Sequence, residues 1–257
     1  MIPNPEHAAA ALPEKRPLRL AHASDIHLDT DYHDGSPHLA LRDKYRRIFA
    51  VLLERIMAQR PDVLLIPGDL FDSNRPSSET VAWTMQSLAA LPVPVVMIPG
   101  NHDCLEDNGV YRRHDFSALP NVTLLAAPEG ESSVLETHAL ALWGRGMRAH
   151  TPEFQPLQGL PAPLPGVWNI ALGHGIYVGA AGLSYRSSPI LSTQIEASGY
   201  DYIALGHHHA LRDVSEAGTT AWYSGSPMPI SPGSSGTFLI TDLRPDQPAR
   251  VTVHSLD

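Results

Sequence analysis

The segment LLIPGDLFD, residues 64–72, combines an apolar run, a glycine and an aspartate that directly follows the glycine. A continuous apolar run of this length is typical of a strand buried on both faces, since a half-exposed strand would alternate. The glycine allows a sharp turn and a close approach of the backbone to a ligand. Because sites in α/β sheets form at the carboxyl ends of such strands, we expect Asp69 to lie in one. Its two carboxylate oxygens could bridge two cations.

Four other segments follow the same plan. Each is an apolar run that ends in aspartate, asparagine or histidine, and in four of the five a glycine directly precedes the polar residue. The four segments are residues 18–27 (LRLAHASDIH), 95–103 (VVMIPGNHD), 169–175 (NIALGHG) and 202–209 (YIALGHHH). Five predicted strand ends therefore present side chains that can bind metals.

The composition is that of one globular domain. With 257 residues and 43% hydrophobic content, the chain can bury a sizeable core. We expect a flexible N-terminal lead at residues 1–17 and a single domain over residues 18–257, with no separate capping domain. Apolar runs fall short of the ~20 residues of a membrane span. The single cysteine, Cys104, fits a reducing compartment, so we expect a cytoplasmic protein with no membrane association.

The charge limits how this chain can bind a polyanion. There are 18 basic and 27 acidic residues, a formal charge of -9. This is the wrong sign for a protein that binds nucleic acid through a broad basic face. Any polyanion must therefore be bound locally.

Helical patterns separate the predicted strands. Apolar residues recur at three- and four-residue spacing over residues 43–60, and Pro61 ends this helix. Ser77 or Ser78 could cap a second helix that runs to residue 91. This alternation predicts a largely parallel sheet with right-handed crossovers. The C-terminal strands predicted at residues 221–224, 237–241 and 250–254 alternate in polarity, which indicates an antiparallel second sheet.

Two of the strand ends carry paired ligands. In an extended segment residues i and i+2 point the same way, so Asp25 and His27 can reach one ion. By the same argument His207 and His209 share one side, and His208 faces the other. A glycine directly precedes this histidine triplet, which makes it more specific than the D-x-H pair.

The third strand end combines three kinds of group. Asn101 offers a neutral oxygen, His102 a titratable imidazole, and Asp103 a carboxylate that could orient that imidazole. Adjacent residues in an extended turn point to opposite sides, so His102 should face away from a metal that Asn101 binds. Three other histidines have no recurring context and receive no function: His114, His138 and His150.

The ordered set D-x-H, G-D, G-N-H-D, G-H and G-H-x-H resembles the calcineurin-like metallophosphoesterase superfamily. Within it, SDIHLD, GDLFDSNRPS, GNHD and YSGSP are similar to the nuclease domain of the SbcD and Mre11 DNA-repair exonucleases. The resemblance covers roughly residues 18–243. It implies an α/β fold in which two central mixed β-sheets pack as a sandwich flanked by α-helices.

The resemblance also assigns roles. It places one metal ion on Asp25, His27, Asp69 and His209, and a second on Asp69, Asn101, His174 and His207. It leaves His102 as the catalytic group, with Asp103 in support, and suggests substrate contacts from Asn101, Arg75 and Ser226. Asp72 stands where many Mre11-type proteins have a histidine. Imidazole-rich ligand sets suit Mn, Fe or Zn better than Mg or Ca, and we expect two Mn ions, with Fe or Zn next.

The expected function is metal-dependent hydrolysis of phosphodiesters. Two metal ions ~3.5–4 Å apart can generate hydroxide near neutral pH and stabilise an in-line displacement by a metal-bridging hydroxide. The substrate would be DNA or nucleotides, with exonuclease-like action and an SMC-like ATPase as partner. Two alternatives stay open: a broad-specificity phosphomonoesterase or cyclic nucleotide phosphodiesterase, and a non-catalytic metal-binding scaffold. The scaffold is the less favoured alternative, because a protein without activity would not need the complete set of ligands together with His102.

Overall fold

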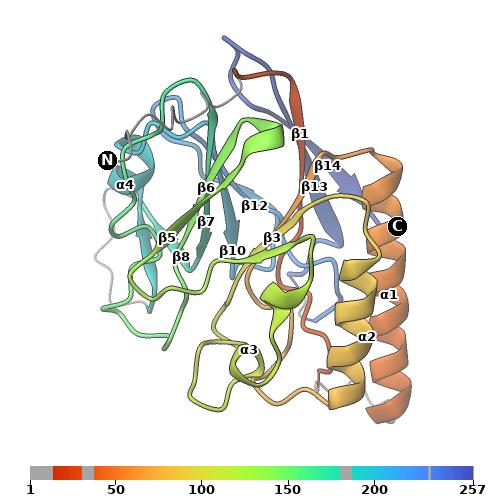
Figure 1. Cartoon of the computed structure of the whole chain (residues 1–257). Helices are drawn as coiled ribbons and strands as arrows, with labels where there is room; N and C mark the ends of the chain where they lie inside the picture. Colours follow the sequence, from red (N-terminus) through yellow and green to blue (C-terminus); the bar gives the residue numbers. More distant parts are fainter. Residues whose placement is uncertain (1–13, 31–37, 180–186, 231–232, 257) are drawn as a thin grey trace, which may run out of the picture.

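The computed structural model describes residues 14–30, 38–179, 187–230 and 233–256 (Figure 1). Most of the predicted N-terminal lead, residues 1–13, lies outside the described residues. The part that is described is held in place by Lys15. Its ammonium lies 2.8 Å from a carboxylate oxygen of Asp201 and 4.4 Å from the ring centre of Trp168.

Two six-stranded sheets form the centre of the fold (Figure 1). The first has the order β14-β13-β1-β2-β3-β4, from β1 (Leu18–His22), β2 (Val63–Pro67), β3 (Val95–Ile98), β4 (Val122–Leu124), β13 (Thr237–Leu243) and β14 (Arg250–Ser255). The second has the order β11-β12-β10-β7-β6-β5, from β5 (Glu131–Leu135), β6 (Leu140–Gly144), β7 (Trp168–His174), β10 (Tyr202–Gly206), β11 (Arg212–Asp213) and β12 (Thr220–Tyr223). A short parallel pair joins β8 (Ile176–Val178) and β9 (Pro189–Leu191).

Both sheets are mixed, as expected. Strands β1 to β4 run parallel, whereas β13 pairs antiparallel with β1. In the second sheet β6, β7, β10 and β12 run parallel, with β5 and β11 antiparallel at the two edges. The sheets face each other across a core that includes Leu20, Leu65, Ile170 and Leu172.

Helices cover the outer faces of this sandwich. On the first sheet lie α1 (His38–Ala58) and α2 (Ser78–Ala89), which pack Phe49 and Val81 with Ile66 of β2 (Figure 1). On the second sheet α4 (Ser192–Glu196) contributes Ile195 to a cluster with Ile203. Helix α3 (Val110–Arg113), which lies between α2 and α4 in the chain, is a single turn. No helix among the described residues combines the length and the apolar character needed to cross a membrane.

The helix boundaries follow from local chemistry. Helix α1 begins at His38, before the predicted residue 43, and ends before Arg60, whose φ of 51° is left-handed. Ser77 caps α2, because its hydroxyl accepts a hydrogen bond from the Thr80 peptide at 3.2 Å. The prediction of a cap at Ser77 is thus confirmed.

The prediction of an antiparallel second sheet from the C-terminal strands is wrong. Strand β12 joins the second sheet in parallel to β10, and β13 and β14 extend the first sheet. Strand β13 is almost fully buried, since Phe238 packs under α1 and Leu243 packs between the sheets. Polarity along a strand reports which of its faces are buried, but it does not report which strand lies beside it.

Candidate metal centre

The carboxyl ends of parallel strands from both sheets meet at one edge of the sandwich. The ends of β2 and β7 are joined where Nδ1 of His174 lies 2.9 Å from the Pro67 carbonyl. Those of β1 and β2 are joined where the Asp69 carbonyl accepts the His27 peptide N–H at 3.0 Å. This edge is where the sequence predicts the site.

The backbone at this edge is strained. Four of the predicted metal-binding residues have left-handed φ angles: Asp25 (56°), His27 (50°), Asp69 (52°) and His207 (95°). Side chains other than glycine rarely adopt this conformation, and such residues cluster at functional sites. Here the left-handed turns redirect side chains from the strand ends toward a common centre.

Two of the glycines that precede polar residues of the centre lie so close to a neighbouring segment that no side chain would fit. A Cβ atom at Gly100 would lie 2.1 Å from Oδ1 of Asp69, and one at Gly206 would lie 2.0 Å from the Pro67 carbonyl oxygen. Neither neighbour can withdraw, because one is a backbone atom and the other belongs to the buried centre. The glycines therefore allow neighbouring strand ends to come into contact.

The structure brings the predicted ligands together in overlapping trios. Within each trio, one nitrogen or carboxylate oxygen per residue lies within 4.8 Å of the others. The trios are Asp25, His27 and His209; Asp69, His174 and His207; and His27, Asp69 and His102. Asp69 and His27 each belong to two trios, so the clusters form one continuous centre.

Asn101 completes this group. Its Oδ1 lies 2.9 Å from Nε2 of His174 and 2.7 Å from Nδ1 of His207. The structure thus places all seven side chains that were expected to bind metal at one centre, although they come from both sheets.

The donor atoms fit divalent cations. Nε2 of His27 is buried and has no hydrogen-bond partner among the described residues, while its Nδ1 lies 2.7 Å from Oδ1 of Asp72. A buried nitrogen without a partner costs free energy unless a further group binds it. Imidazoles anchored through one nitrogen, with the other facing a cluster, are typical of metal ligands. His174 follows this pattern, since its Nε2 lies 3.3 Å from Oδ2 of Asp69.

The electrostatics of the centre favour positive charge between the carboxylates. Burial opposes ionisation of Asp69, but His174 and His27 outweigh it and lower the pKa of this carboxyl. Burial likewise opposes protonation of His174, yet Asp69 and Asp25 raise its pKa to about 9. Burial and the neighbouring His174 lower the pKa of His207 to about 3, so this imidazole is neutral and able to bind a cation.

His102 lies at the centre but differs from the buried ligands. Its side chain is 41% exposed, and its ring lies edge-on to that of His27 with 4.6 Å between centroids. Nδ1 is 2.8 Å from the Asp72 carbonyl, and the peptide N–H donates to Asp69 at 2.9 Å. The backbone is thus fixed to the centre while the ring remains accessible.

Within the part of the chain that the structure describes, the Asp103 carboxylate makes no hydrogen bond to the His102 ring, which it was expected to orient. Its carboxylate is fully buried and accepts hydrogen bonds from the Leu70 peptide at 2.9 Å, the Gly100 peptide at 2.7 Å and the Tyr111 hydroxyl at 2.7 Å. These donors come from the loops after β2 and β3 and from α3. Asp103 therefore joins the loops that carry Asp69 and Asn101, and Asp72 takes the position beside His102.

Arg75 and Ser226, the two other residues expected to contact a substrate, differ in their exposure to solvent. Arg75 is exposed on the loop that follows Asp72. Ser226 is fully buried, and its hydroxyl donates to the Asp25 carbonyl at 2.6 Å. Its hydroxyl thus helps to hold the strained Asp25 turn.

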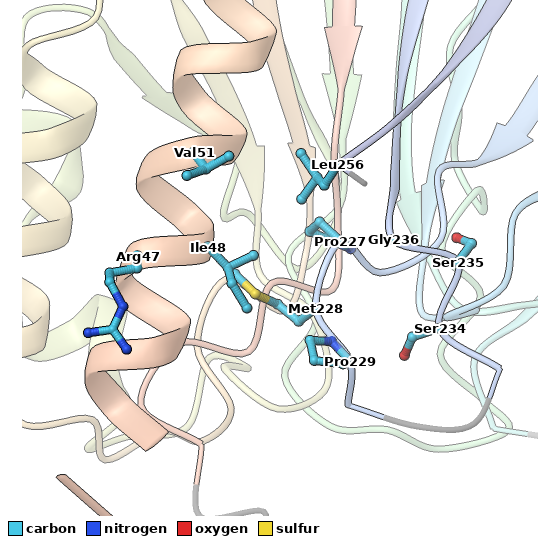
Figure 2. A pocket seen from close by; sticks show the side chains of 10 residues that line it. All are labelled: Arg47, Ile48, Val51, Pro227, Met228, Pro229, Ser234, Ser235, Gly236 and Leu256. Atoms are coloured by element: carbon cyan, nitrogen blue, oxygen red, sulfur yellow. The ribbon is translucent and has the colours of Figure 1, made fainter. Parts of the chain in front are cut away.

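A cavity of about 450 Å³ lies beside the segment that follows Ser226 in the chain, residues 227–229 (Figure 2). It is lined by Ile48 and Val51 of α1 and by Pro227 and Met228. Among the described residues that line it there is no histidine or carboxylate. This cavity is therefore not the centre described above.

Two residues of the centre were missed from sequence. Asp72 holds His27 and also accepts from the Thr30 hydroxyl at 2.8 Å. The sequence drew attention to Asp72 only because many Mre11-type proteins have a histidine at this position, and it indicated no contact with His27. His150 lies edge-on to His207, with 4.9 Å between ring centroids. It follows β6 in a loop with no recurring pattern, so nothing in the sequence indicated it.

Comparisons with known proteins agree with this arrangement. A sequence profile of the family described as Calcineurin-like phosphoesterase matches residues 18–211. The chain is 27% identical over 235 residues to the DNA double-strand break repair protein Mre11 of Methanopyrus kandleri, a match that covers 83% of this chain and 49% of that protein. The chain thus spans about half the length of this curated relative. The crystal structure of TT1561 of Thermus thermophilus has the same fold, with a TM-score of 0.60, 11% identity, and coverage of 93% of this chain and 99% of that one.

Proposed function

Because this chain belongs to the calcineurin-like phosphoesterase family, we propose that it is a dinuclear metal-dependent phosphodiesterase that acts on DNA or nucleotides. One observation carries the proposal: the trio with Asp25 and the trio with His174 are joined through Asp69 and His27. A carboxylate shared in this way can contact two cations at once.

We assign the ligands to two cations. The first would be held by Asp25, His27, Asp69 and His209, and the second by Asp69, Asn101, His174 and His207. The donor set favours Mn, with Fe or Zn next. When bound, two divalent cations neutralise phosphate charge, supply a nucleophile from water near neutral pH and stabilise an in-line displacement.

His102 supplies the proton for the leaving group. A carbonyl can only accept, so Nδ1 of His102 carries the hydrogen that bonds to the Asp72 carbonyl. This leaves Nε2 to hold a second proton and deliver it to the departing oxygen. A positioned general acid contributes roughly 10²- to 10⁴-fold to the rate.

The substrate class rests on the similarity to Mre11 and on the charge distribution. The relative is described as a DNA double-strand break repair protein, which supports a nucleic-acid substrate. The formal charge of -9 favours contacts confined to the site, with Arg75 exposed on its loop. The resemblance to SbcD- and Mre11-type nucleases extends the proposal to an SMC-like ATPase partner and to exonuclease-like action in the cytoplasm.

A substrate panel tests the function. The Mn-loaded protein is offered duplex DNA, a cyclic nucleotide, bis-p-nitrophenyl phosphate and p-nitrophenyl phosphate side by side. We expect faster turnover of DNA and of the diester than of the monoester. Preferred hydrolysis of p-nitrophenyl phosphate would instead indicate a phosphomonoesterase. Full metal occupancy without turnover of any substrate would indicate a non-catalytic scaffold.

A further inference from the structure

Tyr223 links the metal centre to the edge of the second sheet. Its hydroxyl donates to the carbonyl of Gly175, the residue directly after the proposed ligand His174, at 2.8 Å. Its ring lies edge-on to that of His208, with 5.5 Å between centroids. Its backbone pairs with Arg212 in the edge strand β11. Arg212 therefore lies on a surface that borders the proposed ligands.

Arg212 packs on a tyrosine that is itself held in place. Its guanidinium carbon lies 5.2 Å from the centre of the Tyr177 ring, a cation–π contact. The Tyr177 peptide N–H donates to the Tyr223 hydroxyl at 2.7 Å, and the Tyr177 hydroxyl donates to the Glu216 carboxylate. The ring is thus fixed at both ends, and it gives the exposed guanidinium a defined platform.

Chain spacing keeps this pair close to the metal centre. Arg212 follows the proposed ligand His209 by three residues, and Tyr177 follows His174 by three. Three residues span at most ~11 Å between Cα atoms, even when fully extended. A nucleic-acid strand whose reacting phosphate lies at the metals must continue across a neighbouring surface, and the surface around Arg212 is one that it can reach.

The N–H groups of the Arg212 guanidinium are free to bind a ligand. In the other cation–π pairs of the described residues, the cation also binds a carboxylate or a carbonyl, as found for Lys15, Arg46 and Arg145. The Arg212 guanidinium has no ion pair or hydrogen bond with any described residue. Two carboxylates nearby have other partners. Asp213 accepts from the Ser215 peptide at 2.9 Å, and Glu216 accepts from Tyr177.

Building on the proposed phosphodiesterase function, we propose that Arg212 binds a second phosphate of the substrate strand, beyond the phosphate that reacts at the metals. A guanidinium binds two phosphate oxygens at once through its planar N–H groups, and a stacked guanidinium is already oriented for this. The contact provides positive charge locally on a chain whose formal charge is -9. It also selects the substrate class. An oligonucleotide strand can make this contact, whereas a cyclic nucleotide or a phosphomonoester with a single phosphate cannot.

The salt dependence of binding tests this contact. A fluorescein-labelled thymidine 12-mer with phosphorothioate linkages, which resist hydrolysis, is titrated with the Mn-loaded protein at several salt concentrations. On a single strand each neutralised phosphate contributes about 0.7 to the slope of log affinity against log salt. We expect Arg212→Ala to lose about 0.7 from this slope and about fivefold in affinity at ~0.1 M salt. Arg212→Lys keeps the charge and should keep the slope.

Arg250→Ala is the matched control. Arg250 is an exposed arginine at the start of β14, the edge strand of the first sheet, so its removal changes the net charge equally. It lies at the end of that sheet away from the metal centre, because it pairs with Asp242, which pairs with Arg19 near the start of β1. We expect this variant to bind the 12-mer as the wild type does.

Turnover separates substrate binding from a structural role. On an unmodified thymidine 12-mer, Arg212→Ala should raise KM about fivefold and change kcat less than about twofold. Both constants for bis-p-nitrophenyl phosphate, which has one phosphate, should stay as in the wild type. An unchanged salt slope in Arg212→Ala, an equal loss in Arg250→Ala, or equal KM effects on both substrates would overturn the assignment. If the slope changes as expected but the wild type hydrolyses no phosphodiester, the proposed function is wrong and the Arg212 contact stands.

Discussion

The Asp72 carboxylate lies 2.7 Å from Nδ1 of His27. This contact orients the ring so that its other nitrogen, Nε2, faces the metal centre. Burial opposes ionisation of Asp72, but the contact with His27 outweighs it and lowers the pKa of this carboxyl. Asp72 thus stays ionised and fixes both the tautomer and the orientation of the ring.

We therefore expect Asp72→Ala to weaken Mn binding about 10- to 100-fold, the usual effect of losing a partner of a metal-binding histidine. Asp72→Asn keeps an acceptor oxygen and should lose less. His102 contacts the backbone carbonyl of residue 72, so its role should survive both substitutions. Metal titration of the three proteins checks this, and equal affinities would show that Asp72 does not orient His27.

Asp69→Asn should lose both metal ions and all activity together. Asp69 is the carboxylate common to the two proposed ligand sets, and an amide carries no charge to offset the cations. His138→Ala, which changes a histidine outside the centre, should lose neither. Elemental analysis decides the outcome, because two metal ions retained at full occupancy in Asp69→Asn would refute the bridging role.

His102→Ala should separate substrates by leaving group. An alkoxide such as a deoxyribose oxygen needs a proton, whereas p-nitrophenolate leaves readily without one. We expect this variant to keep its metal and to lose roughly 10²- to 10⁴-fold on DNA, and much less on bis-p-nitrophenyl phosphate. Steady-state rates on the two substrates provide the comparison. Equal losses on both, or loss of metal, would remove His102 from the acid role.

DNA binding should be weak and confined to the site. The formal charge of -9 argues against a surface that neutralises many phosphates. The logarithm of a protein's affinity for DNA falls linearly with the logarithm of the salt concentration, and the slope is proportional to the number of phosphates that the protein neutralises. We expect a shallow salt dependence of duplex binding, measured by fluorescence titration with Mn present. Tight binding with a slope equivalent to about six or more contacts would contradict this picture.

His22 should make the fold sensitive to acid. It is fully buried, with Nδ1 2.8 Å from the Tyr202 hydroxyl and Nε2 3.2 Å from the Leu205 carbonyl. Burial lowers its pKa to about 3, so the folded protein keeps it neutral, while the unfolded chain binds a proton below about pH 6.5. Its contribution to stability is complete above pH 6.5 and is lost progressively as pH falls toward 3.

The variant His22→Gln isolates this effect. Between pH 7 and pH 4.5 the free energy of unfolding should fall by about 2–3 kcal/mol less in the variant than in the wild type. Urea unfolding of chelator-treated protein measures both, so that metal release does not contribute. Identical pH dependence in the two proteins would show that His22 is not kept neutral by the fold.

Local patterns in the sequence predict much of the fold. Buried strands produce continuous apolar runs, and the polar residue at each run's end marks where the chain leaves the core. This is why residues 64–72 already indicate a parallel strand with Asp69 at its carboxyl end. The Ser77 cap is predicted for the same reason, since it depends on a residue only three positions away.

The remaining features depend on contacts between segments far apart in the chain. Asp103 follows His102 directly, yet it bonds to Leu70 and Tyr111, and Asp72 takes the place beside His102. His150 reaches His207 only because the loop after β6 is held against two other loops. Residue types and spacing show which side chains can do chemistry. Which of these side chains meet depends on the packing of the two sheets. That packing decides which loops come within the ~3 Å of a hydrogen bond.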